Sequence, residues 1–133
     1  MKYFKRLKVY KAINVTFNPE TQEAYSYGWW RFTARIKGKL VFNDYRYSPT
    51  TGNHQSKIRR LMEDELSLKI DYFIEIPGGL QCLSTGINHY QSRIDELELT
   101  INKPRSHKAK NNERRIEIGE HLKKIKLIKR LGA

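Results

Sequence analysis

The stretch Tyr25–Lys39, YSYGWWRFTARIKGK, alternates two kinds of side chain. Because successive side chains of a strand point to opposite faces, it predicts a two-sided strand. One parity is apolar and suits a core: Trp30, Phe32, Ala34 and Ile36. The other parity is aromatic at one end and cationic at the other: Tyr25, Tyr27, Trp29, Arg31, Thr33, Arg35 and Lys37. This second face either packs under a loop, with its cations solvated, or stacks bases and contacts phosphates.

The flanking segments predict further strands. Leu7–Phe17 alternates apolar residues, and Leu40–Tyr47 is rich in β-branched and aromatic residues, so both are expected to be strands. Asn18–Glu23 has turn chemistry, and Lys37–Lys39 forms a tight reversal around its glycine. Short connections favour an antiparallel meander of three strands.

After Tyr47 the period becomes helical. Ser48 and Pro49 predict an N-cap and a first helical position, a start that Gly52 could delay. The side chains at helical spacing that would pack on the sheet are Ile58, Leu61, Met62 and Leu66. Lys69–Ile76 predicts a fourth strand, ended by Pro77 and two glycines. Its inward side chains would be Ile70, Tyr72, Ile74 and Ile76.

The last third predicts two helices. The first has a stripe with spacing of three and four residues, formed by Ile87, Tyr90, Ile94, Leu97 and Ile101. Its end is ambiguous, because Leu97, Leu99 and Ile101 also alternate as in a strand. The second has a stripe of Ile118, Leu122, Ile125 and Ile128 surrounded by cations.

These elements predict an α+β fold. We expect a four-stranded, mainly antiparallel sheet in the order β-β-β-α-β with one packed helix, followed by a helical basic C-terminal extension. The expected parts are a sheet-plus-helix domain at 1–81, an amphipathic helix at 82–101, a polar linker at 102–112 and a basic amphipathic helix at 113–133.

Charge is the strongest global signal. Twenty-six Lys and Arg against fourteen Asp and Glu give a net charge of +12, with a sequence pI near 9.9. From Lys103 onward there are eleven basic and three acidic residues. Such a balance favours polyanionic partners: nucleic acid, an acidic protein surface or an anionic membrane.

Several classes of protein are disfavoured. No apolar run approaches the ~18 residues that a membrane span needs. The N-terminal MKYFKRLKVYK has no continuous hydrophobic stretch typical of a secretory signal. Cys82 is the only cysteine, which excludes an internal disulfide and is compatible with a reducing cytosol. We therefore expect a cytoplasmic protein without membrane insertion.

Catalytic signals are sparse. The order of elements resembles the opening of ribonuclease H-like nucleases, which hold metal with carboxylates on the first strand, the helix and the fourth strand. Leu7–Phe17 contains no Asp or Glu, although Asp71, Glu75 and the acidic cluster at 63–65 remain. The histidines lack paired zinc-type spacing, and no phosphate-binding glycine motif occurs, so no metal or cofactor is expected.

A metal-free ribonuclease remains as an alternative. It could use His54 or His89 as general base, with Lys57, Arg59 or Arg60 stabilising the transition state. We expect a non-catalytic protein and keep a small nuclease as the second alternative.

Nucleic-acid features carry the main hypothesis. Three antiparallel strands backed by a helix resemble small sheet-type DNA readers, the plant AP2 domain and the arm-binding domain of phage integrases, which place a sheet face in the major groove. WWRFTARIKGKLVF is similar in style to their second and third strands, without a diagnostic motif. Alternatively, Tyr25, Tyr27 and Trp29 could stack unpaired bases.

The chain is therefore expected to bind DNA or RNA without catalysis, a role compatible with a phage or mobile-element accessory protein. The first alternative is a phage-type or regulatory module that binds an acidic protein surface. The candidate contact residues are Tyr25, Tyr27, Trp29, Arg31, Arg35, Lys37, Lys39, Lys57, Arg60, Lys108, Lys110, Arg114, Arg115, Lys123 and Lys124.

The C-terminal basic helix has three interpretations. It could contact phosphates as a tail. It could pair with the helix at 87–101, either as a hairpin or as a dimer through 87–101 and 113–131. It could lie on an anionic membrane, as basic amphipathic helices do. Phosphate binding and a hairpin are compatible, because the apolar and basic faces are distinct.

Overall fold

The structure is a computed structural model that describes residues 10–12 and 14–133. The chain divides into two compact units, of which the first ends at Cys82 and the second is Leu83–Ala133.

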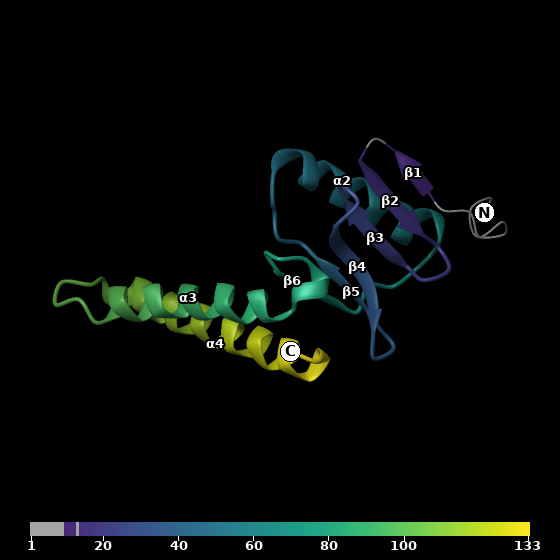
Figure 1. Ribbon diagram of the computed structural model, residues 1–133. Coiled ribbons are helices and arrows are strands. Elements are labelled where there is room, and N and C mark those ends of the chain that lie inside the picture. Colours follow the sequence, from purple (N-terminus) through teal and green to yellow (C-terminus); the bar gives the residue numbers. More distant parts are fainter. Residues whose placement is uncertain (1–9, 13) are drawn as a thin grey trace. The chain divides into compact units, whose positions relative to one another are not determined.

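The first unit is built on a mixed sheet of six strands, which lie side by side in chain order (Figure 1). The strands are β1 (Tyr10–Ala12), β2 (Val15–Asn18), β3 (Glu23–Ser26), β4 (Trp30–Ile36), β5 (Lys39–Asn43) and β6 (Tyr72–Ile74). All neighbours are antiparallel except β5 and β6, which are parallel. The predicted α+β class is confirmed, but the number of strands is wrong.

Two predicted strands are hairpins instead. The described part of Leu7–Phe17 reverses between β1 and β2, where Asn14 has a φ of 61°. Tyr25–Lys37 reverses between β3 and β4, where Tyr27 and Gly28 have φ values of 57° and 77°. Left-handed backbone turns the chain and interrupts both alternating patterns. Leu7, Val9 and Ile13 of the predicted first strand lie outside the described residues.

The inward parity of β4 is confirmed for Trp30, Phe32 and Ala34, which are buried. Thr33, predicted to face outward, is also buried, and Ile36 is only half-buried. The reason is a β-bulge: Arg31 pairs with Tyr25 and Thr33 with Ala24, so Phe32 is an extra residue on β4. A bulge breaks the alternation that a regular strand would keep.

The ends of β5 are set by local chemistry. It begins after a two-residue turn in which Lys37 and Gly38 have φ values of 50° and 78°, as type I′ hairpins require, so the predicted reversal is confirmed. It ends at Asn43 rather than at Tyr47. The Asn43 amide donates to the Ile76 carbonyl at 2.8 Å and accepts from the Ile76 N–H at 2.9 Å, which ties this strand end to the segment after β6.

Helix α2 (Pro49–Arg60) begins where the sequence predicts. Ser48 Oγ accepts from the Thr51 N–H at 3.1 Å, Pro49 occupies the first turn, and Gly52 lies within the helix. A π-helical turn, η1 (Leu61–Glu65), continues it. Figure 1 shows α2 across one face of the sheet, where Ile58 and Met62 pack into the core with residues of β2, β4 and β5.

Strand β6 is shorter than the predicted Lys69–Ile76. Of its predicted inward residues, Ile70, Ile74 and Ile76 are buried, whereas Tyr72 is half-buried. The chain then turns at Pro77 and Gly78 and forms a short 3-10 turn, η2 (Leu80–Cys82).

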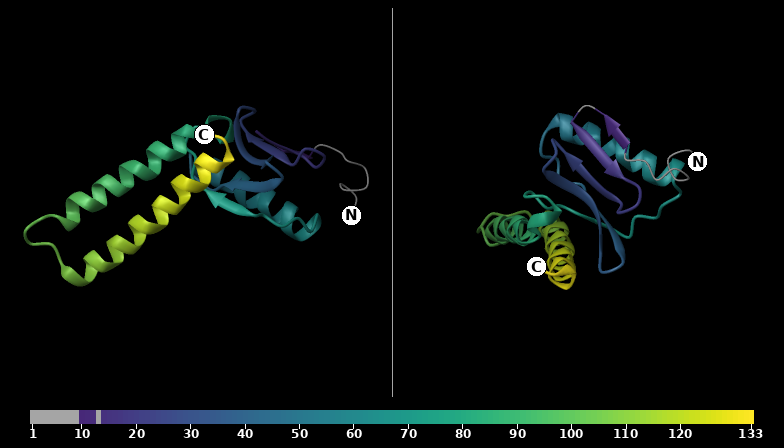
Figure 2. Two further views of the ribbon diagram at one scale, coloured as in Figure 1. Left: turned by 90° about the horizontal axis from the view of Figure 1, so that it is seen from below. Right: turned by 45° about the vertical axis from the view of Figure 1, so that its right-hand side comes forward.

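The second unit is a helical hairpin of α3 (Ser84–Ile101) and α4 (Lys108–Leu131), which lie side by side along their length (Figure 2). The hairpin interpretation of the C-terminal helix is thus the one that the structure adopts. Helix α3 starts before the predicted stripe and stays helical to its end, and α4 begins at Lys108, inside the predicted linker. The buried apolar residues of α3 are Tyr90, Ile94 and Leu97.

The predicted stripe of α4 is wrong at Leu122, which is 46% exposed. The neighbouring His121 lies against α3 instead, with its ring 5.4 Å from that of Tyr90. The predicted stripe counted apolar residues alone, so it left out polar residues on the packed side of α4, such as His121 and Asn111. In the described residues, no helix is both long and apolar enough to cross a membrane.

Candidate nucleic-acid interface

Three aromatic side chains stand out on the surface of the first unit. Among its described residues, the large hydrophobic side chains that are exposed are Tyr27 (43%), Trp29 (51%) and Tyr47 (52%). The rings of Trp29 and Tyr47 meet edge to face, with centroids 5.8 Å apart and planes at 84°. We call these three residues the aromatic cluster.

The backbone that carries Tyr27 and Trp29 is held by hydrogen bonds. The Tyr27 N–H donates to the Asn14 carbonyl at 2.7 Å. The Gln81 side chain donates to the Trp29 carbonyl at 2.8 Å and accepts from the Arg31 N–H at 3.2 Å. The connection between β3 and β4 is therefore fixed from both sides, which lowers the entropy that binding would cost.

Tyr27 occupies an unfavourable backbone conformation. Its φ of 57° lies in the left-handed region, which costs an ordinary residue about 1–2 kcal/mol and which glycine or asparagine adopts more readily. The Tyr27 ring also lies edge-on to His54, with centroids 5.7 Å apart. Strained exposed residues of this kind are frequent at binding sites.

Tyr47 joins the aromatic cluster to the core. Its ring lies 5.9 Å from that of the buried Trp30, whose indole N–H donates to the Pro77 carbonyl at 2.9 Å. The sequence interpretation placed Tyr47 at the end of a predicted strand and did not include it among the candidate contact residues. Its neighbours Trp29 and Trp30 are distant in the sequence, so no local pattern indicates this contact.

A buried polar group lies beneath the cluster. Ser26 Oγ is 2.8 Å from His54 Nδ1 and 3.3 Å from Thr51 Oγ1, and it shares hydrogen bonds with both. His54 is only 7% exposed and Ser26 is fully buried. His54 is thus a structural residue that ties β3 to α2, and its position is poorly suited to act as a general base on an external substrate.

The basic residues of the β4–β5 turn lie at the far end of β4. We call Arg35, Lys37 and Lys39 the basic turn, and all three are exposed. The Arg35 guanidinium is oriented by the Gln22 side chain at 2.7 Å and by the Gly38 carbonyl at 3.1 Å. At about 3.3 Å per residue, the basic turn is roughly 25 Å from Trp29.

Tyr25 and Arg31 are less accessible than the sequence suggested. Both are half-buried, and Arg31 forms an ion pair with Glu23 at 2.8 Å. The strand register aligns Lys11, Thr16, Tyr25 and Arg31 in one row across β1 to β4. This row offers a polar surface, but its arginine already has an internal partner.

The stretch of chain that contains the cluster is strongly basic, with Asp44 as its single carboxylate. Residues 24–43 and 45–62, which contain the cluster and the basic turn, carry eight Lys or Arg and no Asp or Glu. Lys57 and Arg60 are exposed on α2, as is Arg46, which the sequence interpretation missed. Gly52 makes room for Arg46, because a Cβ at Gly52 would lie 2.5 Å from the Arg46 guanidinium.

Most candidate cations of the second unit lie on the surface of α4. Lys108, Lys110, Arg115 and Lys123 are exposed, and Lys124 is half-buried. Arg114 is also half-buried and donates to Asn111 Oδ1 at 2.8 Å, so it serves the packing of the hairpin. Lys123 lines an open depression on α4 together with Lys126, Lys129 and Arg130.

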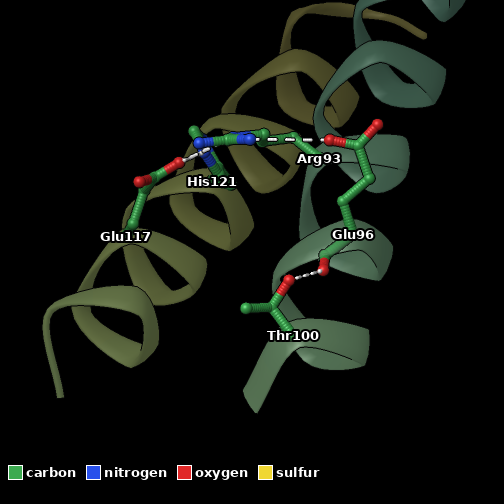
Figure 3. A network of polar contacts seen from close by, with 5 residues as sticks. All are labelled: Arg93, Glu96, Thr100, Glu117 and His121. Atoms are coloured by element: carbon green, nitrogen blue, oxygen red, sulfur yellow. Dashed lines mark hydrogen bonds and ion pairs between the residues drawn. The ribbon is translucent and has the colours of Figure 1, made fainter. Parts of the chain in front are cut away.

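A polar network joins the two helices of the hairpin (Figure 3). Glu117 accepts from Arg93 Nε at 3.0 Å and lies 2.9 Å from His121 Nε2. These contacts, the one with His121 first and the one with Arg93 next, hold the pKa of Glu117 below its usual value. Glu117 in turn raises the pKa of Arg93. The network stabilises the hairpin and involves none of the candidate contact residues.

The candidate carboxylates do not converge. The Asp71 carboxylate accepts from the Leu40 N–H at 2.8 Å, and Glu63 pairs with Arg59 at 3.0 Å, so both have structural partners. Within residues 10–12 and 14–133, no group of three His, Cys, Asp or Glu side chains is placed to hold a metal ion.

Comparisons of the chain with protein-family models, with curated proteins and with solved structures find no match.

Proposed function

We propose that this protein binds nucleic acid without catalysing a reaction on it. The observation that carries the proposal is the aromatic cluster, three exposed rings on a stretch of chain with eight cations and a single carboxylate, Asp44, between residues 24 and 62. Flat aromatic rings and phosphate-binding cations are the two components that single- and double-stranded nucleic-acid sites share.

The two components contribute in different ways. A base stacked on an aromatic side chain is worth ~1–3 kcal/mol, largely independent of sequence. Cations that contact phosphates release counterions, so their contribution falls with salt. The basic turn and the exposed cations of α4 supply this second contribution, whereas the aromatic cluster supplies the first.

The composition of the exposed surface of the first unit suits the stacking of bases. Among the described residues of the first unit, no large aliphatic side chain is exposed, and every exposed large hydrophobic residue is aromatic. Protein interfaces bury a wide mixed surface of about 800 Å² per partner around their aromatic residues. Three exposed rings among cations also suit the flat faces of bases, and the nuclease-treated pull-down below separates the two kinds of partner.

The proposal is tested by fluorescence anisotropy of short labelled oligonucleotides titrated with the protein. We expect binding that weakens between about 50 and 200 mM salt. Replacing two cations of the basic turn, Lys37→Gln with Lys39→Gln, should lower the slope of log K against log salt by roughly 1.5. The matched control, Lys69→Gln with Lys103→Gln, removes the same charge at exposed positions outside the proposed contacts.

Three results would contradict the proposal. One is the absence of binding to any single- or double-stranded oligonucleotide at low salt. Another is a protein partner that stays bound in a pull-down after nuclease treatment and is not displaced by excess nucleic acid, which would favour the acidic-protein alternative. Shortening of the oligonucleotide during the titration, with or without magnesium, would show a nuclease.

A further inference from the structure

We infer that the aromatic cluster is a stacking site for unpaired bases. The preferred ligand is then single-stranded nucleic acid rather than a duplex. This inference rests on the proposed function and adds the strand type and the contact residues, among them Tyr47.

The geometry of the two outer rings forms a corner. Trp29 and Tyr47 are each about half exposed, and their planes meet at 84°. A base that stacks on one ring therefore points its own edge toward the other ring. A base inside a duplex has both faces covered by its neighbours and its Watson–Crick edge paired, so only an unpaired or terminal base can enter this corner.

The cluster lies in connections, away from the flat face of the sheet. Tyr27 and Trp29 belong to the β3–β4 connection, and Tyr47 lies between β5 and α2. A sheet that reads a duplex places the side chains of its face in the major groove. In that position this protein has the row of Lys11, Thr16, Tyr25 and Arg31, in which Tyr25 is half-buried and Arg31 is paired with Glu23. The most exposed aromatic side chains of the first unit are therefore not those that a groove would receive.

The aromatic cluster is preorganised for binding. The Tyr27 N–H donates to the Asn14 carbonyl and the Gln81 side chain donates to the Trp29 carbonyl, which together hold the β3–β4 connection, and Tyr47 packs on the buried Trp30. Tyr27 keeps a left-handed backbone at an exposed position where glycine or asparagine would be more stable. A tyrosine there has a cost in stability, which the contact of its ring with His54, or a contact with a ligand, would offset.

The position of the basic turn also favours a flexible single strand of nucleic acid as the ligand. The basic turn is roughly 25 Å from Trp29 along β4, so one ligand must extend along the strand to contact both. A single strand can follow such a path because its backbone bends freely, and its bases can turn toward the protein.

The test uses the intrinsic fluorescence of the whole protein with single-stranded oligonucleotides and with duplexes of the same sequence. Trp29 is exposed and Trp30 is buried, so quenching by a stacked base should come from Trp29. The Trp29→Phe variant should keep its affinity for the single strand but lose the quenching. The Trp29→Ala variant should bind the single strand about 5- to 100-fold more weakly.

The failure of this inference differs from the failure of the proposed function. If the duplex binds as tightly as the single strand, and Trp29→Ala changes neither affinity, the protein binds nucleic acid but the aromatic cluster is not its binding site for unpaired bases. If neither form binds, the proposed function itself is wrong. Lys69→Gln, which leaves the cluster intact, should not alter the quenching, and a change there would also contradict the inference.

Discussion

Trp29 and Trp30 are neighbours in the chain with opposite surroundings. Trp29 is 51% exposed, whereas Trp30 is 1% exposed, packs against Phe32 and donates to the Pro77 carbonyl. The predicted alternation gave the right exposure for both residues, although only Trp30 lies in a strand and Trp29 belongs to the β3–β4 connection. Substitution of Trp29 should therefore affect mainly binding, and substitution of Trp30 should affect mainly stability.

We expect Trp30→Ala to lower the free energy of unfolding by ~3–5 kcal/mol, because it leaves a large cavity in the core. Trp29→Ala should lower it by less than about 1 kcal/mol, since that ring is half exposed. Urea unfolding followed by circular dichroism measures both values. Equal destabilisation by the two substitutions would show that Trp29 is a packing residue.

Tyr27 allows a second test at this scale. Tyr27→Asn places a residue that tolerates the left-handed backbone, so the free energy of unfolding should stay constant or rise by up to about 1 kcal/mol. Affinity for single-stranded oligonucleotides should fall in the same variant, because the ring is lost. A stable variant with unchanged affinity would assign Tyr27 no role in binding, and strong destabilisation would show that its contact with His54 outweighs the backbone strain.

At the scale of elements, regular patterns were predictable and their interruptions were not. Local chemistry was sufficient to predict the helix start at Ser48–Pro49, the reversal at Lys37–Lys39 and the apolar stripe of α3. The hairpin turns depend on left-handed backbone at Asn14 and Tyr27, which asparagine adopts readily but tyrosine rarely does. The bulge at Phe32 depends on how two strands pair, and no local sequence pattern encodes it.

Part of the candidate site was therefore found and part was missed. Trp29, Tyr27 and the basic turn were predicted and are exposed. Arg31 was predicted as a contact residue, but its partner Glu23 lies in β3, whereas the sequence interpretation placed Glu23 at the end of a turn. Tyr47 was missed because only the tertiary fold places it beside Trp29.

Two glycines with equal space provide a test of backbone conformation. A Cβ at Gly119 in α4 or at Gly28 in the β3–β4 connection would meet no other heavy atom within 4 Å. Gly119→Ala should raise stability by about 0.5–1 kcal/mol, because alanine favours helix. Gly28→Ala should lower it by about 1–2 kcal/mol, because Gly28 has a φ of 77°. Thermal unfolding of the two variants measures both effects, and changes of the same sign would contradict the assigned backbone at one of them.

The polar network of the hairpin predicts a dependence on pH. The pKa of Glu117 is lowered by its contacts with His121 and Arg93, so its stabilising effect is complete above the usual glutamate pKa of about 4 and is lost as the pH falls through the lowered value. Because Glu117 is partly exposed, we expect an effect below about 1 kcal/mol.

Helix melting of the whole protein, followed between neutral pH and about pH 3, measures this effect. In Glu117→Gln the loss of stability on acidification should be smaller than in the unmodified protein. Glu120→Gln, an exposed position on the same helix, serves as the control and should leave the pH dependence unchanged. An identical pH dependence in Glu117→Gln would exclude a contribution of the network to stability.

At the scale of the whole molecule, charge and aromatic surface make separate contributions. The net charge of +12 favours any polyanion and by itself selects none. Selection is assigned to the aromatic cluster, since it offers ring faces that a phosphate or a carboxylate cannot use. If the choice of ligand depended on charge alone, removing the rings would leave the ratio of the affinities for single strand and duplex unchanged.

The most direct test is to locate the contact by photocrosslinking to a single-stranded oligonucleotide that carries a halogenated pyrimidine. Trypsin separates the two parts of the cluster, since Tyr27 and Trp29 fall in residues 12–31 and Tyr47 in residues 47–57. We predict adducts on Trp29, Tyr27 or Tyr47 that disappear in Trp29→Ala or in excess unlabelled strand. Adducts confined to residues 108–131, with none between residues 25 and 47, would contradict the assignment of the aromatic cluster as the binding site.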